Sequence, residues 1–271
     1  MPFTIATWNI NSVRLRAGLV ADMLKQHAPD VLCLQETKCP DDRFPLGEFR
    51  KLGYGHIAIH GQKGYHGVAV LSRHPFATQE SRVFCDRVDC RHIAVTMGPK
   101  AGGAAGVTIH NFYVPAGGDI PDPVANEKFA HKLAFLDEMR VWCGTDRPGS
   151  GRSILVGDLN IAPLENDVWS HKQMVDVVSH TPLECEKLAA VQGEGGWVDA
   201  MRQLVPEPEK LFTWWSYRAQ DWALSNRGRR LDHVWLSQEL AGALSGMSIV
   251  REARGWERPS DHVPVLVSLD V

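Results

Sequence analysis

The sequence has few of the features that build disulfide frameworks, zinc sites or membrane spans. None of its six cysteines forms a C-x-x-C pair, and none clusters with a histidine at zinc-ligand spacing. Such cysteines are typical of reduced core thiols, which predicts a cytoplasmic protein. No apolar run approaches the roughly 18 residues that a membrane span requires. The first residues, MPFTIATW, lack the basic and apolar regions of a secretory signal, so we expect no membrane association.

Neither sign of charge dominates the composition. Lys and Arg total 29, Asp and Glu total 32, and the formal net charge is −3. This excludes a histone-like polycation but allows a local basic surface. The chain has no low-complexity tract, no repeat with a fixed period and no long linker. We therefore expect a single α/β domain spanning residues 1–271.

Short apolar segments alternate with amphipathic ones along the chain. One expected helix has Leu19 and Met23 on its buried face and ends before Pro29, and a second covers Asn126–Trp142. A third begins at the capping box Thr181-Pro-Leu-Glu and runs to about residue 191. The expected strands are Phe3–Trp8, Val31–Leu34, Ile57–Ile59, Val68–Leu71, Ile93–Thr96, Val107–Phe112, Ile154–Val156, His233–Leu236 and Val263–Leu269.

Polar side chains recur at the ends of these expected strands. Each of them alone is typical of a cap or a turn, but together they concentrate carboxylates and amides beyond what turns require. Loops at strand ends can bring such groups together on a rigid base. The residues are Asn9, Asn11, Gln35, Glu36, Asn111, Tyr113, Asp158, Asn160, Asp232, Asp261 and His262.

This set of side chains indicates phosphodiester hydrolysis. Mg²⁺ prefers oxygen ligands and usually takes one or two protein carboxylates together with substrate phosphate. A further carboxylate can activate water, while amides, a phenol and a histidine can hold the phosphate. The sequence has no Gly-rich loop followed by Lys-Ser/Thr and no G-x-S-x-G, which argues against a P-loop nucleotidase and a serine hydrolase.

Ordered motifs over nearly the whole chain resemble the exonuclease III family, the apurinic/apyrimidinic (AP) endonuclease branch of the endonuclease/exonuclease/phosphatase superfamily. The resemblance implies a four-layered α/β sandwich, with two mixed β-sheets flanked by helices. The segments that carry it are Trp8–Arg14, Leu34–Lys38, Gly61–Leu71, Phe112–Pro115, Gly157–Asn160, Leu211–Tyr217, Asn226–Asp232 and Ser260–Pro264.

The resemblance also implies a metal site. Glu36 is the implied principal ligand of Mg²⁺, for which Mn²⁺ would substitute, with Asn11 beside it. Many relatives have Asp at the position of Asn11. Asp261 is implied to lie near the metal or to assist the leaving group.

The implied catalytic residues surround the scissile phosphate. Asp158 would activate the attacking water, and Tyr113 would donate to a phosphate oxygen. His262 would contact the phosphate from the opposite side, oriented by Asp232. The residues implied to align Asp158 and contact phosphate are Asn9 and Asn160.

Further residues are implied to hold DNA. By resemblance Trp214 and Arg229 help to wall the pocket for the flipped abasic sugar, and Arg229 departs from relatives that have an apolar residue there; Trp215 is expected in the core. Ala116 replaces an amide that contacts phosphate in some relatives. The implied DNA contacts are Arg14, Arg16, Lys63, Gly64, Tyr65, Trp214, Arg218, Arg227 and Arg229.

The expected activity is Mg²⁺-dependent cleavage of double-stranded DNA 5′ to abasic sites. A 3′→5′ exonuclease and the removal of blocked 3′ ends are expected beside it, in a monomer. Two alternatives stay open. One is a superfamily phosphohydrolase acting on lipid or inositol phosphates, and the other is a DNA-binding module without catalysis.

Overall fold

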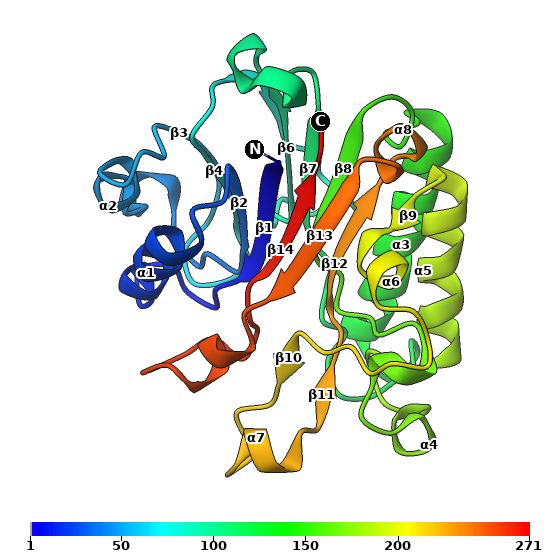
Figure 1. Cartoon of the computed structure of the whole chain (residues 1–271). Helices are drawn as coiled ribbons and strands as arrows, with labels where there is room; N and C mark the ends of the chain where they lie inside the picture. The colour runs from blue at the N-terminus through cyan, green and yellow to red at the C-terminus, as the bar shows by residue number, and fades with distance from the viewer. Residues whose placement is uncertain (1) are drawn as a thin grey trace.

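Two six-stranded mixed β-sheets lie face to face, and helices cover their outer faces (Figure 1). The structure is a computed structural model and describes residues 2–271. Its layers form the four-layered sandwich that the resemblance implies. Because β1 pairs antiparallel with β14, the first and last strands of the chain are neighbours.

The strands of each sheet come from both halves of the chain. The first sheet has the order β13-β14-β1-β2-β4-β3 and the second has the order β5-β6-β7-β8-β12-β9. The first consists of β1 (Phe3–Asn9), β2 (Val31–Gln35), β3 (His56–His60), β4 (Val68–Ser72), β13 (Leu244–Ile249) and β14 (Val265–Leu269). The second consists of β5 (Phe76–Glu80), β6 (His92–Met97), β7 (Thr108–Tyr113), β8 (Ser153–Asp158), β9 (Val198–Asp199) and β12 (Asp232–Leu236).

Each sheet contains one parallel pair, β1 with β2 and β7 with β8. Parallel strands end at the same edge of a sheet, so Asn9 lies opposite Gln35 and Tyr113 lies opposite Asp158. A hydrogen bond of 2.8 Å from Asn9 Nδ2 to Asp158 Oδ2 joins the two edges. The ends of four strands therefore meet at one place.

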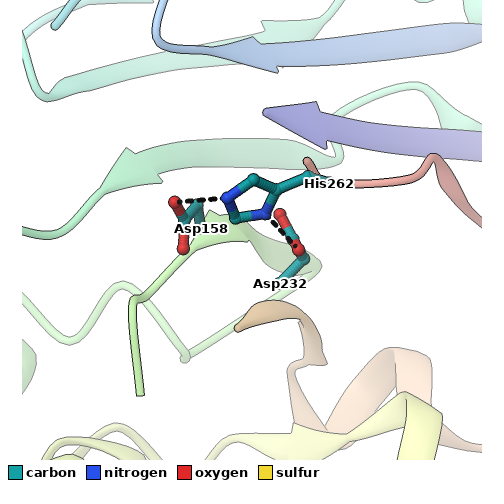
Figure 2. Close-up of side chains that lie close together, drawn as sticks. All are labelled: Asp158, Asp232 and His262. Atoms are coloured by element: carbon teal, nitrogen blue, oxygen red, sulfur yellow. Dashed lines mark hydrogen bonds and ion pairs between the residues drawn. The ribbon is translucent and has the colours of Figure 1, made fainter. Parts of the chain in front are cut away.

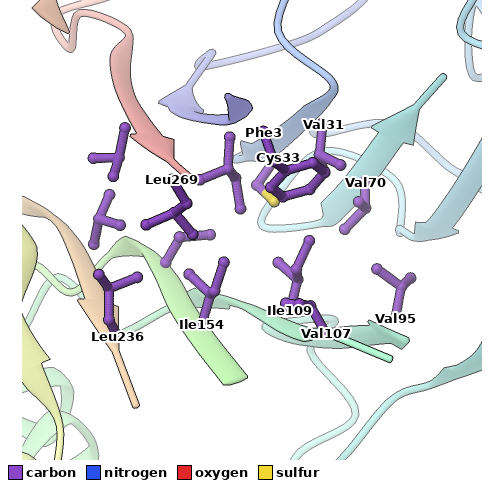
Figure 3. Packing of buried hydrophobic residues seen from close by; sticks show 14 of the residues in the cluster. Phe3, Val31, Cys33, Val70, Val95, Val107, Ile109, Ile154, Leu236 and Leu269 are labelled. Atoms are coloured by element: carbon purple, nitrogen blue, oxygen red, sulfur yellow. The ribbon is translucent and has the colours of Figure 1, made fainter. Parts of the chain in front are cut away.

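Apolar side chains from the inner faces of both sheets form the central core (Figure 3). Residues such as Val31 and Val70 from the first sheet lie in one cluster with Ile109, Ile154 and Leu236 from the second. Each buried aliphatic side chain contributes on the order of 1.5–3 kcal/mol of transfer free energy. This shared cluster holds the two sheets together and fixes the distance between their edges.

A buried polar link between the sheets lies beside this core. Gln35 Nε2 donates to Asn111 Oδ1 at 2.8 Å, and Asn111 Nδ2 donates to the carbonyls of Leu34 and Ala69, both at 3.0 Å. Such groups are costly to bury unless they are hydrogen-bonded. The link therefore favours one alignment of the two sheets. Because Gln35 directly precedes Glu36 in the chain, this alignment also positions Glu36.

The helices cover the outer faces through separate apolar clusters. Helices α1 (Ala17–His27) and α2 (Leu46–Arg50) pack on the first sheet. Helices α3 (Glu127–Thr145) and α5 (Pro182–Gly195) pack on the second. No helix of residues 2–271 is long and apolar enough to cross a membrane. The short helices are α4 (His171–Met174), α6 (Ala200–Leu204), α7 (Trp222–Ser225) and α8 (Gln238–Ala241).

All the expected strands and the three expected helices are present, and the capping box at Thr181 is confirmed. Three edge strands, β5, β9 and β13, are not anticipated by the sequence. β5 and β13 carry polar residues and are largely exposed or half-buried, and β9 has only two residues, so none of them shows an apolar run. The last strand begins at Val265 because Pro264 before it has no amide hydrogen for the ladder.

A two-stranded ribbon and α7 project from the body of the molecule (Figure 1). The ribbon pairs β10 (Trp214–Trp215) with β11 (Gly228–Arg229). Trp214 also forms an isolated bridge with His262, which ties the ribbon to the loop before β14.

Arg230 anchors the segment between the ribbon and β12. Its side chain is fully buried and forms two hydrogen bonds of 2.8 Å with Asp167 and one of 2.6 Å with Asp199. Arg230→Met should destabilise the fold by about 3–5 kcal/mol, because it removes the arginine that pairs with Asp199 and one of the two that pair with the buried Asp167. Urea denaturation measures this loss.

Arg82→Met is the matched control for this prediction. Arg82 pairs with Asp146 at the surface, where each side chain is 45% exposed, so its loss should cost no more than about 1 kcal/mol. Equal destabilisation by the two substitutions would contradict the anchoring role of Arg230.

Candidate active site

The amide of Asn9 connects two carboxylates at the meeting point of the strands. Its Nδ2 donates to Glu36 Oε1 at 2.9 Å and to Asp158 Oδ2 at 2.8 Å. Its Oδ1 accepts the backbone N–H of Asn11 at 3.1 Å. This neutral side chain therefore holds Glu36, from the first sheet, on one side of the site and Asp158, from the second sheet, on the other.

Asp158 is held by the loop that follows β8. The backbone N–H of Asn160 donates to Asp158 Oδ1 at 2.9 Å, and Asn160 Nδ2 donates to Oδ2 at 3.1 Å. Asn160 has a φ of 55°, in the left-handed region that asparagine tolerates. Lys132 Nζ donates to the carbonyl of Asn160 at 2.8 Å and pairs with Glu184, both side chains being fully buried. This buried lysine supports the turn at Asn160.

His262 lies between two carboxylates (Figure 2). Its Nδ1 is 2.8 Å from Asp232 Oδ2, and its Nε2 is 3.6 Å from Asp158 Oδ2. The predicted pair of His262 with Asp232 thus has the geometry of a hydrogen bond. The contact joins the two sheets, since Asp232 begins β12 and His262 precedes β14.

The two carboxylates decide the charge of His262. Burial opposes the cation, but Asp232 and Asp158 outweigh it and raise the pKa of His262 to about 10. Burial raises the pKa of Asp158 to about 7, although the charge of His262 acts against this. At neutral pH His262 is therefore a cation, while Asp158 is poised to exchange a proton.

The oxygens of Glu36 and Asn11 converge on one cation, the ammonium of Lys38. Lys38 Nζ lies 2.8 Å from Glu36 Oε2 and 2.6 Å from Asn11 Oδ1. Burial opposes ionisation of Glu36, but Lys38 and Asn9 together lower its pKa. One carboxylate and one amide oxygen are hard ligands of the kind that Mg²⁺ takes. The residues present thus fit a divalent cation at this position.

Asp261 lies at the edge of this position. Its Oδ1 is 3.3 Å from Asn11 Nδ2, and its Oδ2 accepts Trp214 Nε1 at 2.9 Å. A second group of potential ligand atoms, from Asp158, Asp232 and His262, lies within 4.8 Å of one another. Both nitrogens of His262 face those carboxylates, so we assign this group to proton sharing and not to a metal.

Tyr113 lies buried at the end of β7. Burial raises the pKa of Tyr113 well above its usual range, and Glu36 and Asp158 act in the same direction. Its hydroxyl therefore stays protonated at neutral pH and can donate a hydrogen bond. The Arg91 guanidinium lies 4.9 Å from the ring centroid and holds the ring in place.

The residues expected to contact DNA differ in their exposure to solvent. Arg16 is buried, and its guanidinium donates to the carbonyl of Arg258 at 2.9 Å and to Tyr217 Oη at 3.1 Å. It therefore supports the loop after β1 instead of presenting charge to solvent. The exposed members of the set are Arg14, Lys63, Gly64, Tyr65, Arg218 and Arg227.

Trp214 and Arg229 lie together beside the catalytic residues. Trp214 reaches Asp261 through its indole N–H, and the guanidinium of Arg229 lies 5.0 Å from the Trp214 ring centroid. Trp215 is buried in the cluster beneath the first sheet, which is where the sequence places it. Ala116 is exposed and presents no amide to the site.

Comparison with known proteins now identifies the family. The sequence model described as the Endonuclease/Exonuclease/phosphatase family matches residues 6–262. The chain belongs to this family.

Members of the endonuclease/exonuclease/phosphatase family resemble the chain over its whole length. Exodeoxyribonuclease III of Haemophilus influenzae is 30% identical over 274 residues, which cover 96% of this chain and 97% of that protein. The structure of an AP endonuclease from Archaeoglobus fulgidus has a TM-score of 0.90 at 30% identity and covers 99% of this chain and 100% of that chain. A 3′ phosphatase from Neisseria bound to a product DNA hairpin has a TM-score of 0.89 at 30% identity, with coverage of 99% and 100%.

The family motifs place most of the site, but they leave out its supporting lysines. Lys38 lies in a matched segment without an assigned role, and Lys132 lies outside all of the segments. One signal for Lys132 exists in the sequence: it lies three residues from Phe129 and four from Leu136, on the apolar face of α3. A lysine on such a face needs a buried partner, and Glu184 supplies it.

The charge of His262 can be tested directly. Asp232→Asn should lower the pKa of His262 by about 1–3 units, because it removes the nearest opposite charge. NMR titration with labelled histidine measures this change.

Asp261→Asn is the control for the titration. Asp261 raises the pKa of His262 less than Asp232 and Asp158 do, so its loss should shift the titration less. A pKa of His262 that does not move in Asp232→Asn would show that the two side chains are not coupled.

Proposed function

We propose that this chain is a metal-dependent DNA repair nuclease that cleaves double-stranded DNA 5′ to abasic sites and processes 3′ ends. The observation that carries the proposal is the Asn9 bridge, which places Glu36 and Asp158 on either side of one site, with cationic His262 beside it. The relatives support the same function: they are an exodeoxyribonuclease III, an AP endonuclease and a 3′ phosphatase bound to product DNA.

The metal is Mg²⁺ in this proposal, and Mn²⁺ would substitute for it. Glu36 and Asn11 would hold the ion, and Asp261 lies close enough to bind one of its waters. When bound, the ion neutralises negative charge on the phosphate. With the ion bound, Asn11 Oδ1 would no longer accept a hydrogen bond from Lys38. Lys38 would stay beside Glu36 and balance its charge whenever the ion leaves.

Asp158 is the proposed general base. Asn9 and Asn160 fix its oxygens, so a water bound to the carboxylate is held in one direction. Tyr113 donates to a phosphate oxygen, and the His262 cation stabilises the negative charge that develops on the phosphorane oxygens. Asp232 holds the His262 ring and its proton. Activity should rise with pH as Asp158 ionises near pH 7 and fall as His262 loses its proton near pH 10.

The DNA would lie over the exposed basic residues around the strand ends. Arg14 follows β1, and Lys63, Gly64 and Tyr65 form the turn between β3 and β4. Gly64 has a φ of 89°, which lets the backbone turn sharply beneath the exposed Tyr65. Arg218 and Arg227 extend the same set onto the ribbon and α7.

Residues 1–271 are proposed to form one domain, which the core cluster shared by the two sheets supports. The protein is proposed to act as a monomer, and its cytoplasmic location stays a prediction from the cysteines.

A nicking assay tests the proposal against its two alternatives. The substrates are a duplex with one abasic analogue, an undamaged duplex and a phosphoinositide, each with and without Mg²⁺. We expect Mg²⁺-dependent cleavage 5′ to the analogue, and Asp158→Asn serves as the inactive control. Turnover of the phosphoinositide alone would indicate a lipid phosphatase, and DNA binding without cleavage would indicate a binding module.

Glu36→Gln tests the metal ligand. A neutral amide is a poorer ligand for a hard cation, so activity at ordinary Mg²⁺ should fall by about a hundredfold or more, the scale of losing a charge-stabilising group. Raising the Mg²⁺ concentration should restore part of the rate. Full activity at ordinary Mg²⁺ would remove Glu36 from the metal site.

Lys63→Ala tests the DNA surface. It should weaken binding to every duplex sequence, and the slope of log K against log salt should flatten by roughly one phosphate contact. Lys100→Ala is the matched control, since Lys100 is exposed but lies on the segment between β6 and β7. The same salt slope in wild type and Lys63→Ala would place Lys63 away from DNA.

A further inference from the structure

Arg229 is a partly buried cation without an acidic partner. Its Nη1 donates to the carbonyl of Val178 at 3.2 Å and to Ser179 Oγ at 2.8 Å, and its buried Nε has no hydrogen-bond partner. Over residues 2–271, no carboxylate lies within salt-bridge distance of this guanidinium. The groups that contact the guanidinium are therefore neutral oxygens and the face of the Trp214 ring.

Glu184, the acid whose charge raises the pKa of Arg229, already has partners of its own. Glu184 pairs with Lys132 and accepts hydrogen bonds from the backbone N–H of Ser179 at 3.0 Å and from Thr181 Oγ1 at 2.6 Å. Its oxygens cannot turn toward Arg229 without leaving Lys132 unpaired in the interior. Glu184 therefore acts on Arg229 only from a distance, and no carboxylate of residues 2–271 forms an ion pair with it.

Arg229 lies next to the catalytic residues. It covers the face of Trp214, whose indole N–H binds Asp261 and whose backbone bridges His262. On its other side is Ser179, whose carbonyl accepts the N–H of Ala162 at 2.7 Å, two residues after Asn160. The guanidinium thus lies between the ribbon and the loop that holds Asp158.

We propose that Arg229 binds a second anionic group of the substrate, separate from the phosphate at which cleavage occurs, and thereby favours DNA that carries one. The inference rests on the proposed nuclease function. Buried charges in proteins are nearly always paired, and a guanidinium matches a carboxylate or phosphate with two parallel hydrogen bonds. The second anion has two sources: the carboxylate of a group that blocks a 3′ end, or the next backbone phosphate.

Three duplexes separate these sources. One ends in a 3′-phosphate and has no second anion, one ends in a 3′-phosphoglycolate and adds a carboxylate, and one contains an internal tetrahydrofuran abasic analogue followed by a backbone phosphate. In each, water adds to phosphorus, the bond from phosphorus to the 3′ oxygen breaks, and that oxygen leaves as the 3′-hydroxyl with a proton. The cleaved phosphate is a monoester in the first duplex and a diester in the other two, so each variant is compared with the wild type on the same duplex.

Arg229→Gln should change the preference among the three duplexes. Its kcat/KM on a duplex with a second anion should fall about ten- to hundredfold further than on the 3′-phosphate end, the scale of a lost charge-assisted hydrogen bond. An extra loss on the phosphoglycolate identifies the carboxylate, and an extra loss on the abasic analogue identifies the backbone phosphate. Arg229→Lys keeps the positive charge, so it should keep the wild-type order of kcat/KM among the three duplexes. This variant tests the inference even if Arg229→Gln destabilises the loop.

Arg227→Gln is the matched control. Arg227 is exposed and stacks on Trp169 at 4.6 Å, so its loss should weaken all three reactions by a similar factor. An equal loss on all three duplexes in Arg229→Gln would overturn the inference and leave the nuclease function standing. A wild-type chain that cleaves none of them would overturn both.

Discussion

The site depends on one amide that holds two like charges close together. Glu36 and Asp158 come from different sheets, and their carboxylates would repel each other across a largely buried space. Asn9 donates one hydrogen of its amide to each, so both oxygens gain a partner without the addition of a charge. This contact requires the register of β1 with β2 and a fixed distance between the sheets, which the shared core and the Gln35–Asn111 link maintain.

Acidic side chains outnumber cations around this bridge, and this excess suits a substrate that binds together with a metal ion. Four acids, Glu36, Asp158, Asp232 and Asp261, face two cations, Lys38 and His262. An excess of carboxylate repels a phosphate but attracts a divalent ion, which explains why DNA and metal would bind together. His262 keeps its proton because it lies between two acids, so positive charge is present on the phosphate side at neutral pH.

The sequence predicts the residues of this site better than it predicts their supports. Strand-end polar residues follow from the period of the apolar segments. The structure brings most of them together where the strand ends meet, whereas Gln35 and Asn111 form the buried link between the sheets. The contact of Asp232 with His262 crosses between sheets, however, and no strand pattern shows which sheet a strand joins. Lys132 was not expected because a single lysine on an apolar helix face carries no partner in the sequence. The edge strands β5, β9 and β13 were missed because exposed or very short strands have no apolar period.

The buried pair of Lys132 and Glu184 connects chemistry with substrate selection. Lys132 holds the carbonyl of Asn160, whose amide orients the proposed base, and Glu184 holds the backbone of Ser179, whose hydroxyl receives Arg229. A buried ion pair contributes little net stability but is costly to break, so its value lies in fixing one arrangement. Because both loops are attached to the same pair, a displacement of either loop moves the base and the unpaired guanidinium together. The position of a second substrate anion is thereby tied to the alignment of the attacking water.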